Sequence, residues 1–178
     1  MAGTRFGYTI MNDVSARDIQ MSTCQWSLGN SFDTFAPLGP AIVTKDEIPD
    51  PHSLDIKLSI GGEVLQHSNT RELIFRIPDL IAYISSITSL QPGDIISTGT
   101  PSGVGHGRTP HRWLRPGQTI TTEIQGIGQL VNPVVAEGND SWSRFADTPG
   151  TPAAEVTCLF GGAISRNPSR ASHVSSLD

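Results

Sequence analysis

Charged and amide side chains gather in residues 12–20, a stretch that reads NDVSARDIQ and follows a short β-prone run at residues 8–10. The carboxylate of Asp13 therefore stands at the end of a predicted strand. Carboxylate oxygens are the ligands that Mg²⁺ and similar hard cations prefer, so Asp13 is a candidate metal ligand. A simpler interpretation stays open, in which Asp13 caps a turn and Arg17 and Asp18 pair with their neighbours.

A second candidate region is the loop at residues 99–105, GTPSGVG, which follows a β-prone run at residues 95–98. Loops at the ends of strands are common places for ligand binding. Thr98, at the end of the run, is better explained as a strand residue. The loop has no lysine and is therefore not a P-loop. The whole sequence contains no G-x-S-x-G motif, and its 5 histidines show no metal-binding spacing. These patterns disfavour a P-loop nucleotide-binding protein, a serine hydrolase and a zinc protein.

Short strands joined by turns must position these residues. Alternating apolar residues predict a strand over residues 54–60, and Gly61-Gly62 predicts a tight hairpin into a strand that begins at residue 63. Two more strands are predicted over 120–124 and 130–135. Pro78 predicts the start of one amphipathic helix of about three turns. The apolar stripe expected on that helix consists of Leu80, Ile81, Tyr83, Ile84 and Ile87.

The composition limits the partners and the location of the protein. With 12 Lys and Arg against 17 Asp and Glu, the formal net charge is −5, so nucleic-acid binding is not expected. No window approaches the roughly 20 apolar residues of a membrane helix, and the first residues lack the apolar core of a signal peptide. We therefore expect a cytoplasmic protein. Cys24 and Cys158 lie far apart and outside any C-x-x-C pair, which predicts reduced cysteines with a packing role.

The domain organisation follows from the loss of periodicity after Gly138, where Ser, Pro, Gly and Ala dominate. We expect one folded domain over residues 1–137 and a flexible tail over residues 138–178.

Several motifs, in the same order, resemble the C-terminal catalytic domain of the fumarylacetoacetate hydrolase family. The resemblance covers about residues 6–137. It rests on residues 7–18 (GYTIMNDVSARD), 31–40 (SFDTFAPLGP), 55–65, 68–70, 91–94 (QPGD), 98–105 (TGTPSGVG), 126–128 and 132–135 (NPVV). The resemblance implies a mainly β fold, namely a mixed β-roll with one or two short helices. It also implies a homodimer.

The same resemblance implies a role for individual residues. Asp13 would be a ligand of a divalent metal, Mg²⁺ or alternatively Mn²⁺ or Ca²⁺. Arg17 and Gln20 would bind the carbonyl or carboxylate oxygens of a small keto acid, and Thr100 would close the pocket from the opposite loop. A metal and fixed donors can stabilise the enolate that develops when a β-keto acid is cleaved or enolised.

The chain departs from the family pattern in two ways. Asn30 stands where family members carry a catalytic lysine, and an amide can donate a hydrogen bond but carries neither the proton nor the charge. In addition, the family's other metal carboxylates, a Glu-x-Glu pair, and its His/Glu dyad lie upstream of the strand at Gly7. Since the chain starts at Met1, we expect a version shortened at the N-terminus.

These observations leave three functional hypotheses, of which the third is a non-enzymatic interaction domain whose acidic clusters are solvated surface. The first is a family enzyme that carries out metal-assisted C–C bond hydrolysis, decarboxylation or keto–enol isomerisation of a β-diketo or 2-oxo acid, with Asp13, Arg17, Gln20, Asn30 and Thr100 in its site. The alternative is a degenerate, catalytically weak member that acts as a binding or dimerisation partner. A longer product of the same gene would carry the complete site, with a mitochondrial location as an option.

Overall fold

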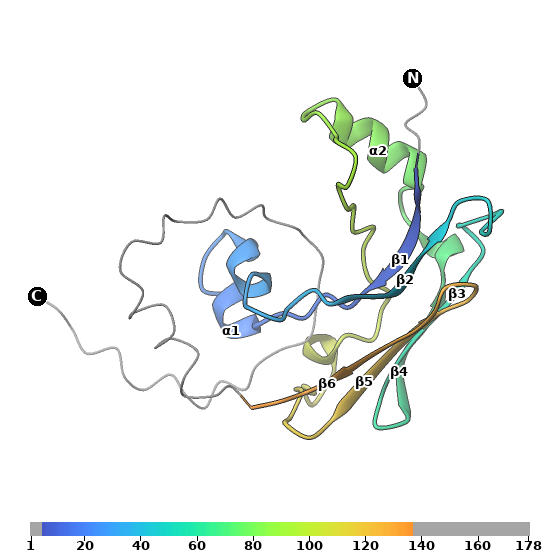
Figure 1. Ribbon diagram of the computed structural model, residues 1–178. Coiled ribbons are helices and arrows are strands. Elements are labelled where there is room, and N and C mark those ends of the chain that lie inside the picture. Colours follow the sequence, from blue (N-terminus) through green and yellow to red (C-terminus); the bar gives the residue numbers. More distant parts are fainter. Residues whose placement is uncertain (1–4, 137–178) are drawn as a thin grey trace, which may run out of the picture.

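Two antiparallel sheets form the framework of the computed structural model, which describes residues 5–136 (Figure 1). In the smaller sheet β1 (Gly7–Met11) pairs with β2 (Leu38–Thr44). The larger sheet has the strand order β4-β3-β5-β6, with β3 (Asp55–Ile60), β4 (Glu63–Asn69), β5 (Thr119–Ile124) and β6 (Gly128–Pro133). β1 lies against β5 and β6, and β2 lies against β6, so the end of β1 faces the larger sheet.

Within the described residues, two α-helices and three single 3₁₀ turns connect the strands. The helices are α1 (Arg17–Gln20) and α2 (Ile77–Ser85). The 3₁₀ turns are η1 (Trp26–Asn30), η2 (Thr70–Glu72) and η3 (Gly105–Gly107). The predicted fold class, mainly β with one or two short helices, is confirmed.

The predicted hairpin forms because its apolar residues alternate and its turn is made of glycine. Leu58 and Ile60 of β3 are buried with Leu65 of β4 and Ile120 of β5 in one hydrophobic cluster. Burial of each such side chain stabilises the fold by about 1.5–3 kcal/mol. Gly61 and Gly62 close the hairpin with φ of +57° and +87°, values that disfavour a side chain.

The prediction for the long helix was only partly right. α2 ends at Ser85, before Ile87, and Tyr83 and Ile87 are 69% and 72% exposed. Leu80, Ile81 and Ile84 are half-buried, and no residue of α2 is buried completely. In Figure 1 the helix extends away from both sheets, which accounts for its weakly covered apolar side.

Two strand assignments need correction. Residues 95–98 form no strand and belong to neither sheet, since a β-prone composition does not by itself provide a pairing partner. Conversely, β2 was not predicted, since Gly39 and Pro40 suggest a turn. β2 tolerates Pro40 because its pairing with β1 is irregular there, with a register shift between Tyr8 and Ile10.

Three other expectations concern Cys24, the membrane and the C-terminal residues. Cys24 is a free cysteine, as predicted, but it is exposed and has no packing role. Across residues 5–136, no helix has the length and apolarity that a bilayer crossing requires. The predicted tail at 138–178, with Cys158, lies outside the described residues.

Candidate functional site

β1 carries the candidate metal ligand to its place. Ile10 is fully buried and anchors the strand, and the backbone N–H of Asn12 donates to the carbonyl of Pro37 over 3.1 Å. The Asn12 amide also donates to Oδ1 of Asn132 on β6, over 3.2 Å. These two contacts hold Asn12 just after the end of β1. The next residue, Asp13, is therefore only 6% exposed. The prediction that Asp13 lies at a strand end is confirmed.

The close packing of α1 on η1 brings Asn30 to this carboxylate. The N–H of Ala16 donates to the carbonyl of Gly29 over 2.7 Å. A Cβ atom on Gly29 would stand 2.5 Å from Cβ of Gln20, so only glycine allows this approach. The neighbouring Asn30 therefore reaches Asp13, although 17 positions separate them in the sequence.

One hydrogen-bonded network contains four of the five predicted site residues. The Asn30 amide nitrogen donates to Oδ1 of Asp13 over 2.9 Å and to Oγ of Ser15 over 2.7 Å. The carbonyl oxygen of Asn30 accepts from Nε2 of Gln20 over 3.0 Å. A guanidinium nitrogen of Arg17 donates to Oε1 of Gln20. The structure thus brings together Asp13, Arg17, Gln20 and Asn30, with Ser15 as a fifth member.

Burial disfavours the charged forms of Asp13 and Arg17. Burial raises the pKa of the Asp13 carboxyl above its ordinary value, against the Asn30 hydrogen bond and the charge of Arg17, which lower it. Burial likewise lowers the pKa of Arg17, against the charge of Asp13. Oδ2 of Asp13 and Nε of Arg17 are buried without a hydrogen-bond partner among the described residues. An unsatisfied buried acceptor and an unsatisfied buried donor are costly to the protein alone, and a ligand could satisfy both.

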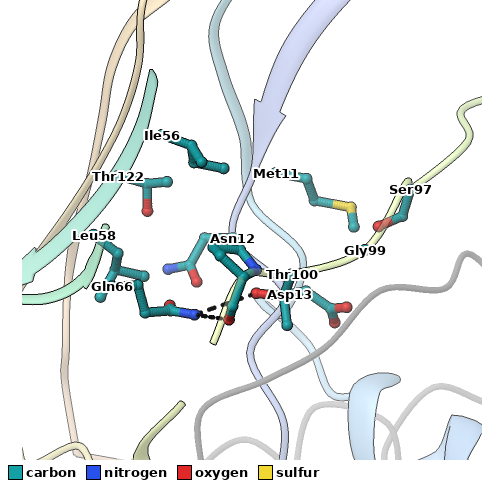
Figure 2. Close-up of a pocket in the computed structure, with 11 residues that line it drawn as sticks. Met11, Asn12, Asp13, Ile56, Leu58, Gln66, Ser97, Gly99, Thr100 and Thr122 are labelled. Carbon is teal, nitrogen blue, oxygen red and sulfur yellow. Dashed lines mark hydrogen bonds between the residues drawn. The ribbon is translucent and has the colours of Figure 1, made fainter. Parts of the chain in front are cut away.

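A pocket opens beside Asp13, between the end of β1 and the larger sheet (Figure 2). Thr100 lines it from the loop that follows residue 98, and its Oγ1 stands 3.5 Å from Nε2 of Gln66. Gln66 also donates to the carbonyl of Pro101 over 2.7 Å, which fixes that loop to β4. The pocket is lined by Met11, Asn12, Asp13, Ile56, Leu58, Gln66, Ser97, Gly99, Thr100, Pro101 and Thr122.

Sequence reasoning assigned no role to three of the polar residues found here. Ser15 is completely buried in the network, and Gln66 and Thr122 line the pocket at 4% and 5% exposure. Oγ1 of Thr122 has no hydrogen-bond partner within the described part of the chain. A signal existed for Thr122, because it is a polar residue two positions after Ile120 and so on the buried face of β5.

Another group that the sequence did not single out is a ring cluster near Arg17. The rings of His106 and His111 stack with centroids 5.0 Å apart, and Trp113 lies 5.1 Å from His111. Burial lowers the pKa of His106, and the charge of Arg17 and then that of His111 lower it further. His106 therefore belongs to the electrostatic surroundings of Arg17.

The simpler interpretation of residues 12–20 describes this site in part, because Arg17 does bond to a near neighbour, Gln20. Asp13 accepts a side-chain hydrogen bond from Asn30 instead of only capping a turn, and Arg17 bonds to Gln20 while its charge acts on Asp13. Asp18 is exposed.

The donor set fits a hard divalent cation in part. Oδ2 of Asp13 is a buried carboxylate oxygen without a partner, the ligand type that such cations prefer. Asp13 is the sole carboxylate among the residues that line the pocket, and the described residues hold no group of three or more His, Cys, Asp or Glu that could enclose an ion. Among residues 5–136 the pocket therefore offers one carboxylate ligand, and the remaining ligands would have to be neutral protein oxygens, water or substrate.

Comparison with known proteins places this geometry in context. Residues 6–135 match the model of the family described as fumarylacetoacetate (FAA) hydrolase, C-terminal. The chain is 52% identical over 130 residues to the mitochondrial oxaloacetate tautomerase Fahd2a of Rattus norvegicus, covering 72% of this chain and 42% of the relative. It thus spans about two fifths of the length of the curated relatives it matches.

Solved structures agree with this match. A fumarylacetoacetate hydrolase from the psychrophilic Exiguobacterium antarcticum superposes with a TM-score of 0.71 at 42% identity, over 74% of this chain and 47% of that chain. A maleylpyruvate hydrolase from Sphingobium sp. SYK-6, crystallised with manganese(II) and pyruvate, gives a TM-score of 0.63 at 37% identity, over 73% of this chain and 44% of that chain.

Proposed function

The chain belongs to the fumarylacetoacetate hydrolase family, and from that membership we propose that it acts on a small 2-oxo acid, with keto–enol tautomerisation of oxaloacetate as its reaction. Similar relatives in rat, cattle, human and Xenopus laevis are named oxaloacetate tautomerases. Other family members are named isomerases or maleylpyruvate hydrolase. Enolisation next to a 2-oxo group is a step that tautomerisation, decarboxylation and C–C hydrolysis can share, so the same site chemistry supports all three.

The tautomerisation breaks the C3–H bond of the keto acid and forms an O–H bond at the C2 oxygen, with no other change in atoms. Negative charge develops on that oxygen while the proton moves. Arg17 and Gln20 do not line the pocket themselves, but hydrogen bonds join them through Asn30 to Asp13, which does. From there they would bind the carboxylate and carbonyl oxygens of the substrate with positive charge and amide hydrogen bonds. A preorganised donor of this kind is typically worth about 10²–10³ in rate. Thr100 would close the pocket from the opposite side.

The cofactor in this proposal is Mg²⁺ or Mn²⁺, with Ca²⁺ as a substitute of the same oxygen-binding class. Asp13 would hold the ion through Oδ2, the buried oxygen without a partner. When bound, such an ion polarises the 2-oxo group of the substrate. The support from relatives is the maleylpyruvate hydrolase that was crystallised with manganese(II) and pyruvate.

The observation that carries the proposal is the hydrogen-bonded network that joins Arg17 to Asp13, which lines the pocket. Within residues 5–136, Oδ2 of Asp13 and Nε of Arg17 are each buried without a hydrogen-bond partner. The test follows the ultraviolet absorbance of enol-oxaloacetate with the full 178-residue chain, with added Mg²⁺ and after chelation. We expect metal-dependent turnover that Asp13→Asn lowers by at least about 100-fold. The exposed Asp18→Asn is the matched control and should retain the activity. Activity that survives both chelation and Asp13→Asn would refute the proposal.

A second candidate is a catalytically weak member that binds a ligand or a partner without efficient turnover. It is favoured by the sole carboxylate among the pocket residues and by the neutral Asn30. Under this alternative the chain would bind pyruvate or oxaloacetate in calorimetry but would show no turnover above the background rate with either metal. The same assay therefore separates the two candidates.

The cellular location is also a proposal. Several similar tautomerases carry the word mitochondrial in their names, which suggests mitochondria for a longer product. For the chain itself the cytoplasmic location stays a prediction from sequence. Fractionation of cells that express the chain with a C-terminal tag would distinguish the two.

A further inference from the structure

A chain of hydrogen bonds runs from the cation of the site to its anion. Arg17 donates to Oε1 of Gln20, Nε2 of Gln20 donates to Oδ1 of Asn30, and Nδ2 of Asn30 donates to Oδ1 of Asp13. Each bond has its donor on the side of Arg17 and its acceptor on the side of Asp13. Bonds aligned in this way polarise and strengthen one another.

The two charged ends determine how the two amides are oriented. An ionised carboxylate only accepts, so Asn30 must turn its NH₂ group toward Asp13. The carbonyl of Asn30 then faces Gln20, which must present its own NH₂ group. This leaves the Gln20 carbonyl for Arg17, which only donates. The orientation of Gln20 toward Arg17 therefore depends on Asn30.

Ser15 makes this arrangement rigid. The second N–H of the Asn30 amide donates to Oγ of Ser15 over 2.7 Å, and Ser15 is fully buried. With both N–H groups and the carbonyl engaged, the Asn30 side chain cannot turn without breaking three bonds. Lysine at this position could donate to Asp13 but could not accept from Gln20, and aspartate could accept but not donate.

We propose that Asn30 is a positioning residue that couples the metal end of the site to its substrate-oxygen end. It holds Asp13 so that Oδ1 is occupied and Oδ2 stays free for a cation, and it keeps the Gln20 carbonyl turned toward Arg17. This proposal rests on the proposed function for the roles of Asp13 and Arg17. It differs from the role expected at the sequence level, in which Asn30 acts directly on the substrate.

The test uses the full chain labelled with ¹⁵N and titrated with Mn²⁺ alone, without a keto acid. Side-chain amide resonances of Asn30 and Gln20 report the hydrogen bonds, and electron paramagnetic resonance of free Mn²⁺ gives the affinity. In the wild type we expect Mn²⁺ to broaden the Asn30 amide signal, because that amide is bonded to the proposed ligand. Asn30→Ala should weaken Mn²⁺ binding about 10- to 100-fold and shift the Gln20 amide resonances. Asn30→Ser, which keeps one donor, should lie between.

The matched control is Asn69→Ala, which removes an asparagine that bonds to Asp55 and Arg71, outside the network. It should leave the Mn²⁺ affinity and the Gln20 resonances unchanged. If Asn30 only supports folding, Asn30→Ala or Asn30→Ser would lower the melting temperature without changing either readout of the folded protein, and this would overturn the proposal. Absence of broadening at Asn30 in the wild type would overturn it as well. If both readouts respond but oxaloacetate is not turned over, the positioning role stands and only the proposed function fails.

Discussion

Arg17→Lys should have opposite effects on stability and on activity. In the metal-free protein, Nε of Arg17 is a buried donor with no hydrogen-bond partner among residues 5–136. A buried donor that stays unsatisfied costs about 1–3 kcal/mol. Lysine keeps the positive charge near Asp13 and can donate to Gln20 from its terminal nitrogen, while a methylene group replaces Nε. We expect the free energy of unfolding to rise by about 1 kcal/mol, or about 4 °C in melting temperature.

The activity should fall because, under the proposed function, that same N–H would donate to the substrate. A hydrogen bond to a charged oxygen contributes about 1.5–3 kcal/mol, so kcat/KM for oxaloacetate should decrease about 10- to 150-fold. The assays are thermal unfolding in the presence of a chelator and enol absorbance with Mg²⁺. A variant that loses stability together with activity would show that Nε already has a structural partner, and undiminished kcat/KM would show that Arg17 does not contact the substrate.

Three other predictions concern pH, packing and assembly. Burial raises the pKa of the Asp13 carboxyl above its ordinary 3.8. In the metal-free protein the carboxyl therefore contributes stability that is fully present below pH 3.8 and is lost as the pH rises through the raised pKa. Asp13→Asn should therefore melt higher than the wild type at neutral pH and lose this advantage in acid, and an equal difference at every pH would contradict the assignment. Gly29→Ala should destabilise the fold by about 1–3 kcal/mol and lower turnover, since its Cβ would stand 2.5 Å from Cβ of Gln20. The control in thermal unfolding is Gly107→Ala, whose Cβ would stand 3.6 Å from its nearest neighbour, Cγ2 of Val104. The weakly covered side of α2 and the exposed Ile74 and Phe75 predict a homodimer. Light scattering should therefore give twice the chain mass, and the double variant Phe75→Asp, Tyr83→Asp should be a monomer. A wild type that is monomeric at all concentrations would disprove the prediction.

The sequence alone determined the features that depend on neighbouring residues. The alternation of residues 54–60 and the pair Gly61-Gly62 predict the β3–β4 hairpin correctly, because strand periodicity and turn geometry act over a few residues. The position of Asp13 at the end of β1 is local in the same sense. The family resemblance then indicated which distant residues share a site, but not how they contact one another.

Only the tertiary structure decided the contacts that join distant segments. Asn30 reaches Asp13 because Gly29 lets η1 approach α1 closely, and Thr122 and Gln66 meet Thr100 in one pocket because β4 and β5 flank β3 in the sheet. The amide orientations of Asn30 and Gln20 follow from the charges at the two ends of the chain of hydrogen bonds, which sequence periodicity does not encode. For the same reason residues 95–98, β-prone by composition, form no strand: a strand needs backbone pairing with a neighbouring strand, and these residues belong to neither sheet of the folded chain.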